Sequence, residues 1–370
     1  ISPRDWSSDV CSSDLLALKA GDTPQAIEHW QHARRTNPGA LRPRLQLARH
    51  ARETGALDDA VDFAREAYQV APYAPGVQLE YCLSLLARGK HDEALPLARL
   101  LVTRFPEDGV LARLLAIALA RNNDAKGLRE ILSRMAEAAP DNLDARVALA
   151  RLALQEGKAR EAAALADEIS RHPKGAALGL ELRGDAAIGD GHADAAADAY
   201  AQAFEQAPTR ELVLKLDDAE RRAGRPGGRL ETWLREHPAD LQVQTVYAGQ
   251  LQAAGDDPAA IGVFEKVLAA APDSAVIRNN LAWLYRKNGD GRALEMAEQA
   301  YKLAPRRAEI ADTYGWILLE QGRHEQAVKI LEAAIKLAPG NPDIRFHWAS
   351  ALERTGREDD ARRELEALLE

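Results

Sequence analysis

The sequence predicts an all-α solenoid of about ten helical hairpins, and three observations carry that prediction. Ten prolines recur along the chain at intervals of 30 to 35 residues, most of them 33 or 34. Glycines, with one asparagine among them, recur about half a repeat earlier. Between these two series the apolar residues follow a three- and four-residue spacing, which is the period of an amphipathic helix. A fixed period of this length is typical of repeats that bury their apolar faces against their neighbours.

The two series place the helix boundaries. A proline ends the helix before it, because proline lacks a backbone N–H and restricts the residue that precedes it. A glycine or an asparagine can close a helix because it tolerates the left-handed backbone conformation. The prolines are Pro38, Pro72, Pro106, Pro140, Pro173, Pro208, Pro238, Pro272, Pro305 and Pro339. The turn residues are Gly21, Gly55, Gly89, Asn123, Gly157, Gly191, Gly224, Gly255, Gly289, Gly322 and Gly356.

One repeat, residues 142–173, shows the pattern that the others follow. Asn142 can cap a helix start, since a short polar side chain accepts hydrogen bonds from the free N–H groups of the first turn. Apolar spacing predicts a helix over residues 143–154, which Gly157 closes, and a second helix over residues 160–170. The proline that follows stops the second helix. Each repeat is therefore expected to be a first helix, a tight turn, a second helix and a proline break.

Small side chains recur at fixed places in these hairpins, where they let two helices approach closely. A larger side chain there would overpack the contact by about 1–3 kcal/mol. Seven residues before the turn stand Ala48, Cys82, Ala116, Ala150, Gly184, Ala248, Ala282, Gly315 and Ala349. Five residues after the turn stand Ala26, Ala60, Ala94, Ala162, Ala196, Ala260, Ala327 and Ala361. A second alanine follows as Ala33, Ala67, Ala203, Ala300 and Ala334, and large residues such as Tyr200 and Leu331 are expected to fill the complementary positions.

The order of small residue, turn glycine, two alanines and proline, at a period of 34, resembles the tetratricopeptide repeat. The resemblance covers residues 15–370. It implies hairpins that wind into a right-handed superhelix, with a concave groove lined by the first helices. A repeat of this kind is specific for the fold and says little about the function.

The chain is expected to divide into four segments. Residues 1–14 have no apolar period and look in part like the translation of a sequencing adapter, so we expect a disordered artefact; a natural linker is the alternative. Residues 15–208 form an N-terminal subarray whose first helix is truncated. Residues 209–238 form an irregular repeat. Residues 239–370 form a C-terminal subarray that ends in a charged capping helix, as terminal repeats need a polar outer face.

The irregular repeat departs from the pattern in three ways. Its proline interval is 30 residues, and Asp217 stands in a small-residue position with Asp218 and Glu220 beside it. The segment Arg225–Gly228 shortens the start of the second helix. We interpret this repeat as weakly packed and as a hinge between the two subarrays. Ordinary variation among repeats is the alternative interpretation.

Composition narrows the classes of function. The 370 residues carry a formal net charge of −9, so no basic face for nucleic acid is expected. No apolar run approaches the roughly 20 residues that span a bilayer. Cys82 occupies a small-residue position and is expected to be a buried structural thiol. His29 and His32 lie three residues apart but lack a third metal ligand. We expect no catalytic residue, metal or cofactor, and a protein that is not an enzyme.

The candidate binding residues lie on the first helices of the last three repeats. In tetratricopeptide-like arrays particular positions of these helices line the groove, and Trp283 and Trp316 occupy equivalent ones and are expected to lie side by side. Two indoles beside polar groups can form a platform for a peptide or a sugar chain. The alternative is that both tryptophans pack between helices as core. The matching residues are Asn279, Trp283, Arg286, Asp312, Trp316, Leu319, Phe346, Ser350 and Glu353.

Several C-terminal strings resemble a narrower family, the tetratricopeptide-repeat lipoproteins of the bacterial PEP-CTERM/exosortase system. The strings are Asn279–Leu284, Arg292–Ala297, Asp312–Trp316, Pro342–Ala349 and Ala361–Leu365. The resemblance implies a non-enzymatic scaffold that binds a partner protein or peptide in its concave groove, in exopolysaccharide production and surface-protein sorting. Polysaccharide or its synthesis machinery is a further partner under this interpretation. The implied location is periplasmic or anchored at the outer membrane, with the lipid-anchor cysteine upstream of this sequence.

Two other interpretations stay open. The repeats can be the regulatory region of a larger enzyme, such as a glycosyltransferase. They can also form a cytoplasmic adaptor of the assembly or chaperone type, which would bind short peptide tails.

Overall fold

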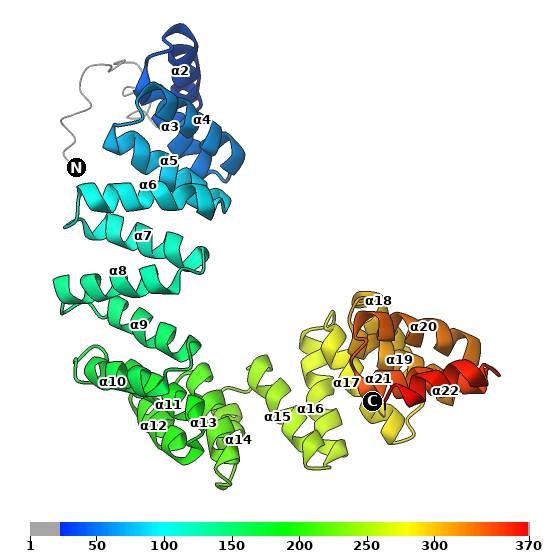
Figure 1. The fold of residues 1–370 in the computed structure, drawn as a ribbon. Coiled ribbons are helices and arrows are strands. Elements are labelled where there is room, and N and C mark those ends of the chain that lie inside the picture. Colours follow the sequence, from blue (N-terminus) through cyan, green and yellow to red (C-terminus); the bar gives the residue numbers. More distant parts are fainter. Residues whose placement is uncertain (1–22, 369–370) are drawn as a thin grey trace. The chain divides into compact units, whose positions relative to one another are not determined.

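The structure, a computed structural model, describes residues 23–368 (Figure 1). Those residues form twenty-one α-helices and no β-strand, so the all-α prediction is confirmed. In the first half of the chain the helices are α2 (Thr23–Thr36), α3 (Leu41–Glu53), α4 (Leu57–Val70), α5 (Pro75–Arg88), α6 (His91–Arg104), α7 (Gly109–Arg121), α8 (Ala125–Ala138), α9 (Asp144–Gln155), α10 (Ala159–Ser170), α11 (Ala176–Gly189) and α12 (Ala193–Gln206). The remaining helices are α13 (Arg210–Arg222), α14 (Arg229–Glu236), α15 (Leu241–Ala253), α16 (Asp257–Ala270), α17 (Ala275–Lys287), α18 (Ala293–Leu303), α19 (Ala308–Glu320), α20 (His324–Leu337), α21 (Pro342–Arg354) and α22 (Glu358–Glu366).

Successive helices pair into ten hairpins, from α3 with α4 to α21 with α22. Each hairpin contributes a first helix, with an odd label, and a second helix, with an even label. The helix α2 is the second helix of a further repeat. The predicted remnant of its first helix, residues 15–20, and the predicted artefact, residues 1–14, lie outside the described residues. The prediction of an α-solenoid of about ten hairpins is confirmed.

The predicted turn residues adopt the left-handed backbone conformation, with positive φ. Gly89, for example, has φ 84° and closes α5, with its N–H bonded to the carbonyls of the last turn. Asn123, the one exception to glycine, reaches φ 55°, as a short polar residue can. Positive φ is found at all ten hairpin turns within residues 23–368, at Gly55, Gly89, Asn123, Gly157, Gly191, Gly224, Gly255, Gly289, Gly322 and Gly356.

The small-residue positions are points of close helix approach. A Cβ added at Gly184 would lie 2.4 Å from the ring of Tyr200, across the hairpin of α11 and α12. A Cβ added at Gly315 would lie 2.5 Å from Cγ of Leu331, across the hairpin of α19 and α20. Both partners were predicted from the sequence as the large residues of these contacts. Cys82 also fills a small-residue position and is fully buried, and burial raises the pKa of its thiol to about 12.

The chain divides into two compact units, Ile1–Gln206 and Ala207–Glu370. In the first unit the largest apolar core runs continuously from α4 to α9. In the second unit one core cluster joins α15 to α19, and two more continue through α22. Each unit therefore has the layered core of a solenoid, in which a repeat packs on the next one.

The irregular repeat lies in the second unit as α13 and α14, the latter only eight residues long. Its buried carboxylates are paired: Asp217 accepts from Arg221 and Gln250, and Glu220 accepts a bidentate pair from Arg229. Acidic residues in the small-residue positions are thus accommodated by polar partners rather than by apolar packing. The interpretation of this repeat as a hinge stays a prediction.

Asp240, at the start of α15, ties the irregular repeat to the next helix. Its carboxylate accepts from Arg210, from the indole of Trp233 and from the N–H of Val243. Burial favours the neutral acid, but these hydrogen bonds outweigh burial and hold the pKa of Asp240 below its ordinary value. The carboxylate therefore stays ionised at neutral pH and stabilises the junction of α13, α14 and α15.

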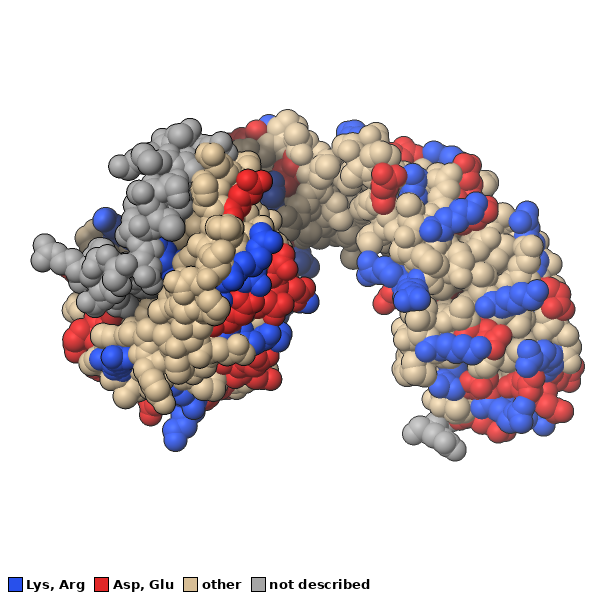
Figure 2. Space-filling model, turned by 90° about the horizontal axis from the view of Figure 1, so that it is seen from above, with Lys and Arg blue, Asp and Glu red and all other residues tan. Residues whose placement is uncertain are grey.

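The visible surface carries interspersed charges. On the face drawn in Figure 2, basic and acidic side chains alternate without a large patch of either sign. Among residues 23–368, no helix is long and apolar enough to cross a membrane.

Candidate binding surfaces

The predicted binding residues lie on three first helices of the second unit, α17, α19 and α21. Each of these helices contacts the next directly, α17 with α19 and α19 with α21. Between them lie the second helices α18 and α20, which carry alanine at both close contacts. The three helices therefore follow one another in order, and we call the predicted residues on them, together with His347, the C-terminal aromatic surface. It comprises Asn279, Trp283, Arg286, Asp312, Trp316, Phe346 and His347.

The centre of this surface is an aromatic group built by α19 and α21. The ring of His347 stacks on the indole of Trp316, with centroids 4.1 Å apart and an interplanar angle of 28°. Phe346 lies beside them, 6.4 Å from Trp316, and its side chain remains 49% exposed. The Nδ1 atom of His347 lies 2.8 Å from a carboxylate oxygen of Asp312, which fixes the ring in place. The group therefore combines an apolar, partly exposed set of rings with a carboxylate that holds His347.

The α17 end of the surface carries two cations, Arg286 and Lys287, and each is paired with a carboxylate. The guanidinium of Arg286 lies 6.0 Å from the ring centroid of Trp283 and donates to Glu320 of α19 at 2.8 Å. The ammonium of Lys287 lies 5.4 Å from the same ring, within the range of a cation–π contact. Arg286 thus links α17 to α19. Its Nε atom and Oδ1 of Asn279 are buried and have no hydrogen-bond partner within residues 23–368.

The structure brings some of the predicted residues together and separates others. Asp312, Trp316 and Phe346 converge through His347, whereas no ring contact joins Trp283 to Trp316 within the described part of the chain. Both tryptophans are partly buried and pack against core clusters, so groove and core interpretations remain open for them. Leu319 is buried in the core, while Ser350 donates to the Phe346 carbonyl and Glu353 is exposed.

His347 was not predicted from the sequence, although it completes the aromatic group. It stands one residue after the predicted groove position of Phe346. Its stacking on Trp316 depends on how two helices 31 residues apart in the sequence place their side chains. The available signal in the sequence was that His347 follows Phe346, a predicted groove residue, in the helix next to the one that carries Asp312.

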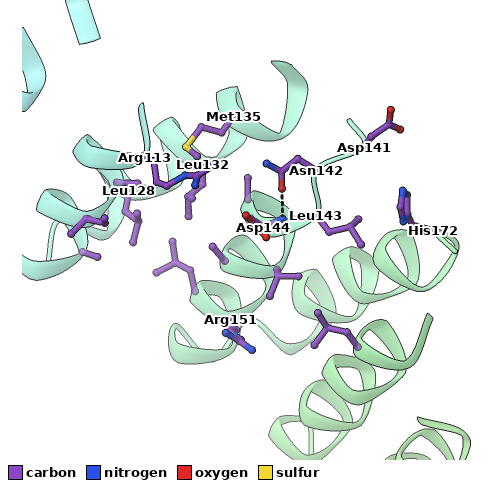
Figure 3. Close-up of a pocket in the computed structure, with 18 of the residues that line it drawn as sticks. Arg113, Leu128, Leu132, Met135, Asp141, Asn142, Leu143, Asp144, Arg151 and His172 are labelled. Carbon is purple, nitrogen blue, oxygen red and sulfur yellow. Dashed lines mark hydrogen bonds between the residues drawn. The ribbon is translucent and has the colours of Figure 1, made fainter. Parts of the chain in front are cut away.

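A second surface, in the first unit, was also missed. A cleft of about 930 Å³ opens between α7, α8 and α9 and reaches the start of α11 (Figure 3). Its lining is mainly apolar, and Arg113 of α7, Arg151 of α9 and Asp144 of α9 add charge. Figure 3 shows Leu128, Leu132 and Met135 of α8 between the two first helices. We call this opening the α7–α9 cleft.

The cleft coincides with large residues at two positions where α4, α12, α18 and α20 carry alanine. These positions lie twelve and five residues before the proline that ends the repeat, and in α8 they hold Leu128 and Met135. In α4, α18 and α20 both are alanine, and the first helices that flank each of these contact each other directly. Among residues 23–368, α7 and α9 make at most sparse contact. The alanine pattern is not the whole account, since α9 contacts α11 although α10 carries Glu161 and Glu168 at these positions. We predict that the bulk of Leu128 and Met135 keeps α7 and α9 apart, and their departure from alanine was the available signal in the sequence.

No group of His, Cys, Asp and Glu side chains that could hold a metal ion is present among residues 23–368. Both surfaces consist of aromatic, aliphatic and guanidinium groups. Such groups suit the recognition of a polypeptide or a stacked ligand, since they provide apolar contact area with a few polar anchors.

Comparison with known proteins identifies the repeat. The fold defines a protein of the helical-hairpin repeat class, and a tetratricopeptide-repeat model matches residues 15–75 and 281–342, with a second such model over residues 318–370. The chain carries tetratricopeptide repeats, which are typical of protein-interaction scaffolds. No curated protein matches the sequence.

Similar solved structures include the complex of Naa15/Naa10 bound to HypK-THB, with 16% identity over 96% of this chain and 67% of that chain and a TM-score of 0.35. Yeast Tom70 has 16% identity over 96% of this chain and 83% of that chain, with a TM-score of 0.44. MamA from Desulfovibrio magneticus RS-1 has 17% identity over 41% of this chain and 86% of that chain, with a TM-score of 0.38.

Proposed function

We propose that the chain is a non-enzymatic scaffold and that the C-terminal aromatic surface docks a polypeptide segment of a partner protein. The observation that carries the proposal is the group of Trp316, His347 and Phe346, with half of the Phe346 side chain exposed. An apolar side chain of the partner would pack against Phe346 and Trp316. Large aromatic side chains of this kind carry much of the binding energy at interfaces.

Phe346 is the best residue for a test, because it contributes little to the core. Trp283 and Trp316 are partly buried, so their removal would lower stability as well as binding. Phe346→Ala should leave the fold intact and lower partner recovery about tenfold or more, as for an interface hot spot. The measurement is affinity purification of the tagged chain from its host with quantitative mass spectrometry.

A matched control is Leu337→Ala, which removes an equally exposed apolar side chain at the end of α20. This variant should recover the same proteins as the unaltered chain. Equal recovery with Phe346→Ala and with the unaltered chain would contradict the proposal. Loss of binding to host polysaccharide, with protein recovery unchanged, would assign the platform to a sugar chain.

We further propose, more specifically, that the scaffold serves bacterial exopolysaccharide production and PEP-CTERM surface-protein sorting as a lipoprotein. The resemblance of the C-terminal strings supports this proposal. It is tested by sequencing the gene through its 5′ boundary. An export signal with a lipid-anchor cysteine ahead of further repeats would support it. A start codon that leads straight into repeats would favour a cytoplasmic adaptor, and an upstream catalytic domain would favour the regulatory region of an enzyme.

A further inference from the structure

The α7–α9 cleft is part of a longer trough. A second opening of about 430 Å³ lies beside it, toward the turn that precedes α7. The two openings share four lining residues, Arg113, Met135, Asn142 and Ala145. The larger opening alone falls in the size range of small-molecule sites, roughly 300–1,000 Å³. With its continuation, the trough has room for an elongated small molecule.

The apolar part of the trough is aliphatic. Ile117 of α7 is 48% exposed, and Val147 of α9 and Leu178 of α11 are partly buried. Leu128 and Met135 of α8 line the same opening. Among the described residues that line the two openings, none is Phe, Tyr or Trp. Ligands with planar rings are held by stacking on aromatic side chains, so this lining favours a flexible hydrocarbon chain instead.

The fixed charges of the trough are of both signs. Arg113 of α7 and Arg151 of α9 line the larger opening together with Asp144 (Figure 3). Taken together, the two linings hold four fixed cations and five carboxylates. An ionic headgroup of either sign would meet repulsion as well as attraction among these groups. The nearly balanced charges therefore favour an uncharged ligand.

Polar groups of the lining are engaged within the protein. The Oδ1 atom of Asn142, which borders both openings, accepts a hydrogen bond from the N–H of Asp144 at 3.0 Å (Figure 3). The carboxylate of Asp108 accepts from the N–H groups of Val110 and Leu111 at the start of α7. An extended polypeptide laid over the aliphatic residues would leave backbone N–H and C=O groups short of partners, which is costly. A hydrocarbon chain has no such groups to satisfy.

We propose that the trough binds a single-chain lipid with an uncharged headgroup, whose hydrocarbon chain lies against Ile117, Leu128, Met135 and Val147. Removal of the chain and of these side chains from water would drive binding. The headgroup would remain at the rim, in contact with water. This inference goes beyond the proposed function, since it concerns the other unit and a ligand that is not a protein.

The inference is tested with N-phenyl-1-naphthylamine, an uncharged probe whose fluorescence rises in apolar surroundings. The probe is titrated into the full chain and then displaced by 1-decanol, by 1-octanol or by decanoate. 1-Decanol should displace it at a roughly tenfold lower concentration than 1-octanol, because two more CH₂ groups leave water. Decanoate, which has as many carbon atoms as 1-decanol and a carboxylate, should displace it less well than 1-decanol.

Two pairs of variants locate the binding site. Ala148→Trp fills the larger opening and should weaken probe binding about tenfold or more, whereas Ala195→Trp, at an exposed residue of α12, should leave binding unchanged. Ile117→Asp places a charge on the aliphatic lining and should weaken binding similarly. Its control is Val110→Asp, at a residue of α7 that is 73% exposed and lines neither opening. Circular dichroism of each variant verifies that the helices are retained.

Three results would overturn the inference. The first is the absence of probe binding, and the second is undiminished binding to Ala148→Trp. The third is stronger displacement by decanoate than by 1-decanol, which would show that the cations of the rim select an anionic headgroup. Displacement of the probe by a leucine-rich helical peptide, but not by 1-decanol, would likewise contradict the inference and assign the trough to a polypeptide.

Discussion

The first helices of the repeats stand together in one region of the molecule and apart in another. In the second unit α17 contacts α19 and α19 contacts α21, and these three helices carry the C-terminal aromatic surface. In the first unit, α7 and α9 flank a cleft of about 930 Å³. Both regions are built from the same repeat, with a positive-φ turn residue and a proline break in each hairpin, although the turn after α7 is Asn123 rather than glycine.

The two regions differ in their second helices. Helices α18 and α20, which lie between first helices that contact each other, carry alanine twelve and five residues before the repeat proline, as Ala293 and Ala300 in α18. Between the helices that stand apart, α8 carries Leu128 and Met135. Since interaxial distances depend on the side chains at the contact, larger residues move the flanking helices outward. We predict from this contrast that the size of these two second-helix residues influences how closely the flanking first helices approach.

The largest expected loss of stability comes from a substitution at the close contact between α19 and α20. Gly315→Ala places a Cβ 2.5 Å from Leu331, and should cost about 1–3 kcal/mol of stability through overpacking. Alanine would otherwise gain up to about 1 kcal/mol over glycine inside a helix. The measurement is chemical unfolding of the full chain, followed by tryptophan fluorescence.

The control for this prediction is Gly262→Ala in α16. No atom lies within 4 Å of a Cβ at that position, so the variant should keep or gain stability. The two variants are therefore expected to change stability in opposite directions. If Gly315→Ala were more stable than the unaltered chain, α19 and α20 would not be in close contact at Gly315, and the prediction would be wrong.

A smaller loss of stability is expected in the second unit when the pH is lowered. The hydroxyl of Tyr285 donates to Glu265 at 2.6 Å, and Arg292 donates to the same carboxylate. The hydrogen bond from Tyr285 is the main cause that lowers the pKa of Glu265, against the opposing effect of burial. A carboxylate with a lowered pKa stabilises the fold above its ordinary pKa, near 4.3, and this stabilisation is lost as pH falls through the folded-state pKa.

Glu265→Gln should therefore reduce the loss of stability on acidification. The side chain is 42% exposed, so solvent screening limits the difference to about 0.5 kcal/mol. Unfolding of the variant and the unaltered chain is compared at pH 7 and pH 3. If both proteins lost the same stability, the hydrogen bonds of Glu265 would not contribute to the packing of α16 against α17.

Most of the fold could be predicted from the sequence, because its determinants are local. A turn glycine, a proline break and helical spacing act within a few residues, and the hairpin turns with positive φ follow them. The sequence also placed Trp316 and Phe346 at equivalent positions of neighbouring repeats, and the structure brings the two rings close together. That they line a binding groove stays a prediction. His347 was missed, because its stacking on Trp316 arises between helices rather than within one.

The cleft could not be predicted in the same way. It opens beside Leu128 and Met135, which stand in place of alanine in α8. The consequence of such a departure depends on whether neighbouring helices repack or separate. Repacking would have filled the space, and separation leaves it open. The choice between these outcomes is made by tertiary packing, which the repeat pattern does not encode.

The central claim is that the size of the second-helix residues sets the spacing of the first helices. It is tested most directly by a spin-label distance between α7 and α9, with labels at Ala120→Cys and Gln155→Cys, both exposed, and with Cys11→Ser. Buried Cys82 is left in place. Adding Leu128→Ala and Met135→Ala should shorten the mean distance by about 2 Å, as helix spacing follows side-chain size. An unchanged or longer distance would contradict the account.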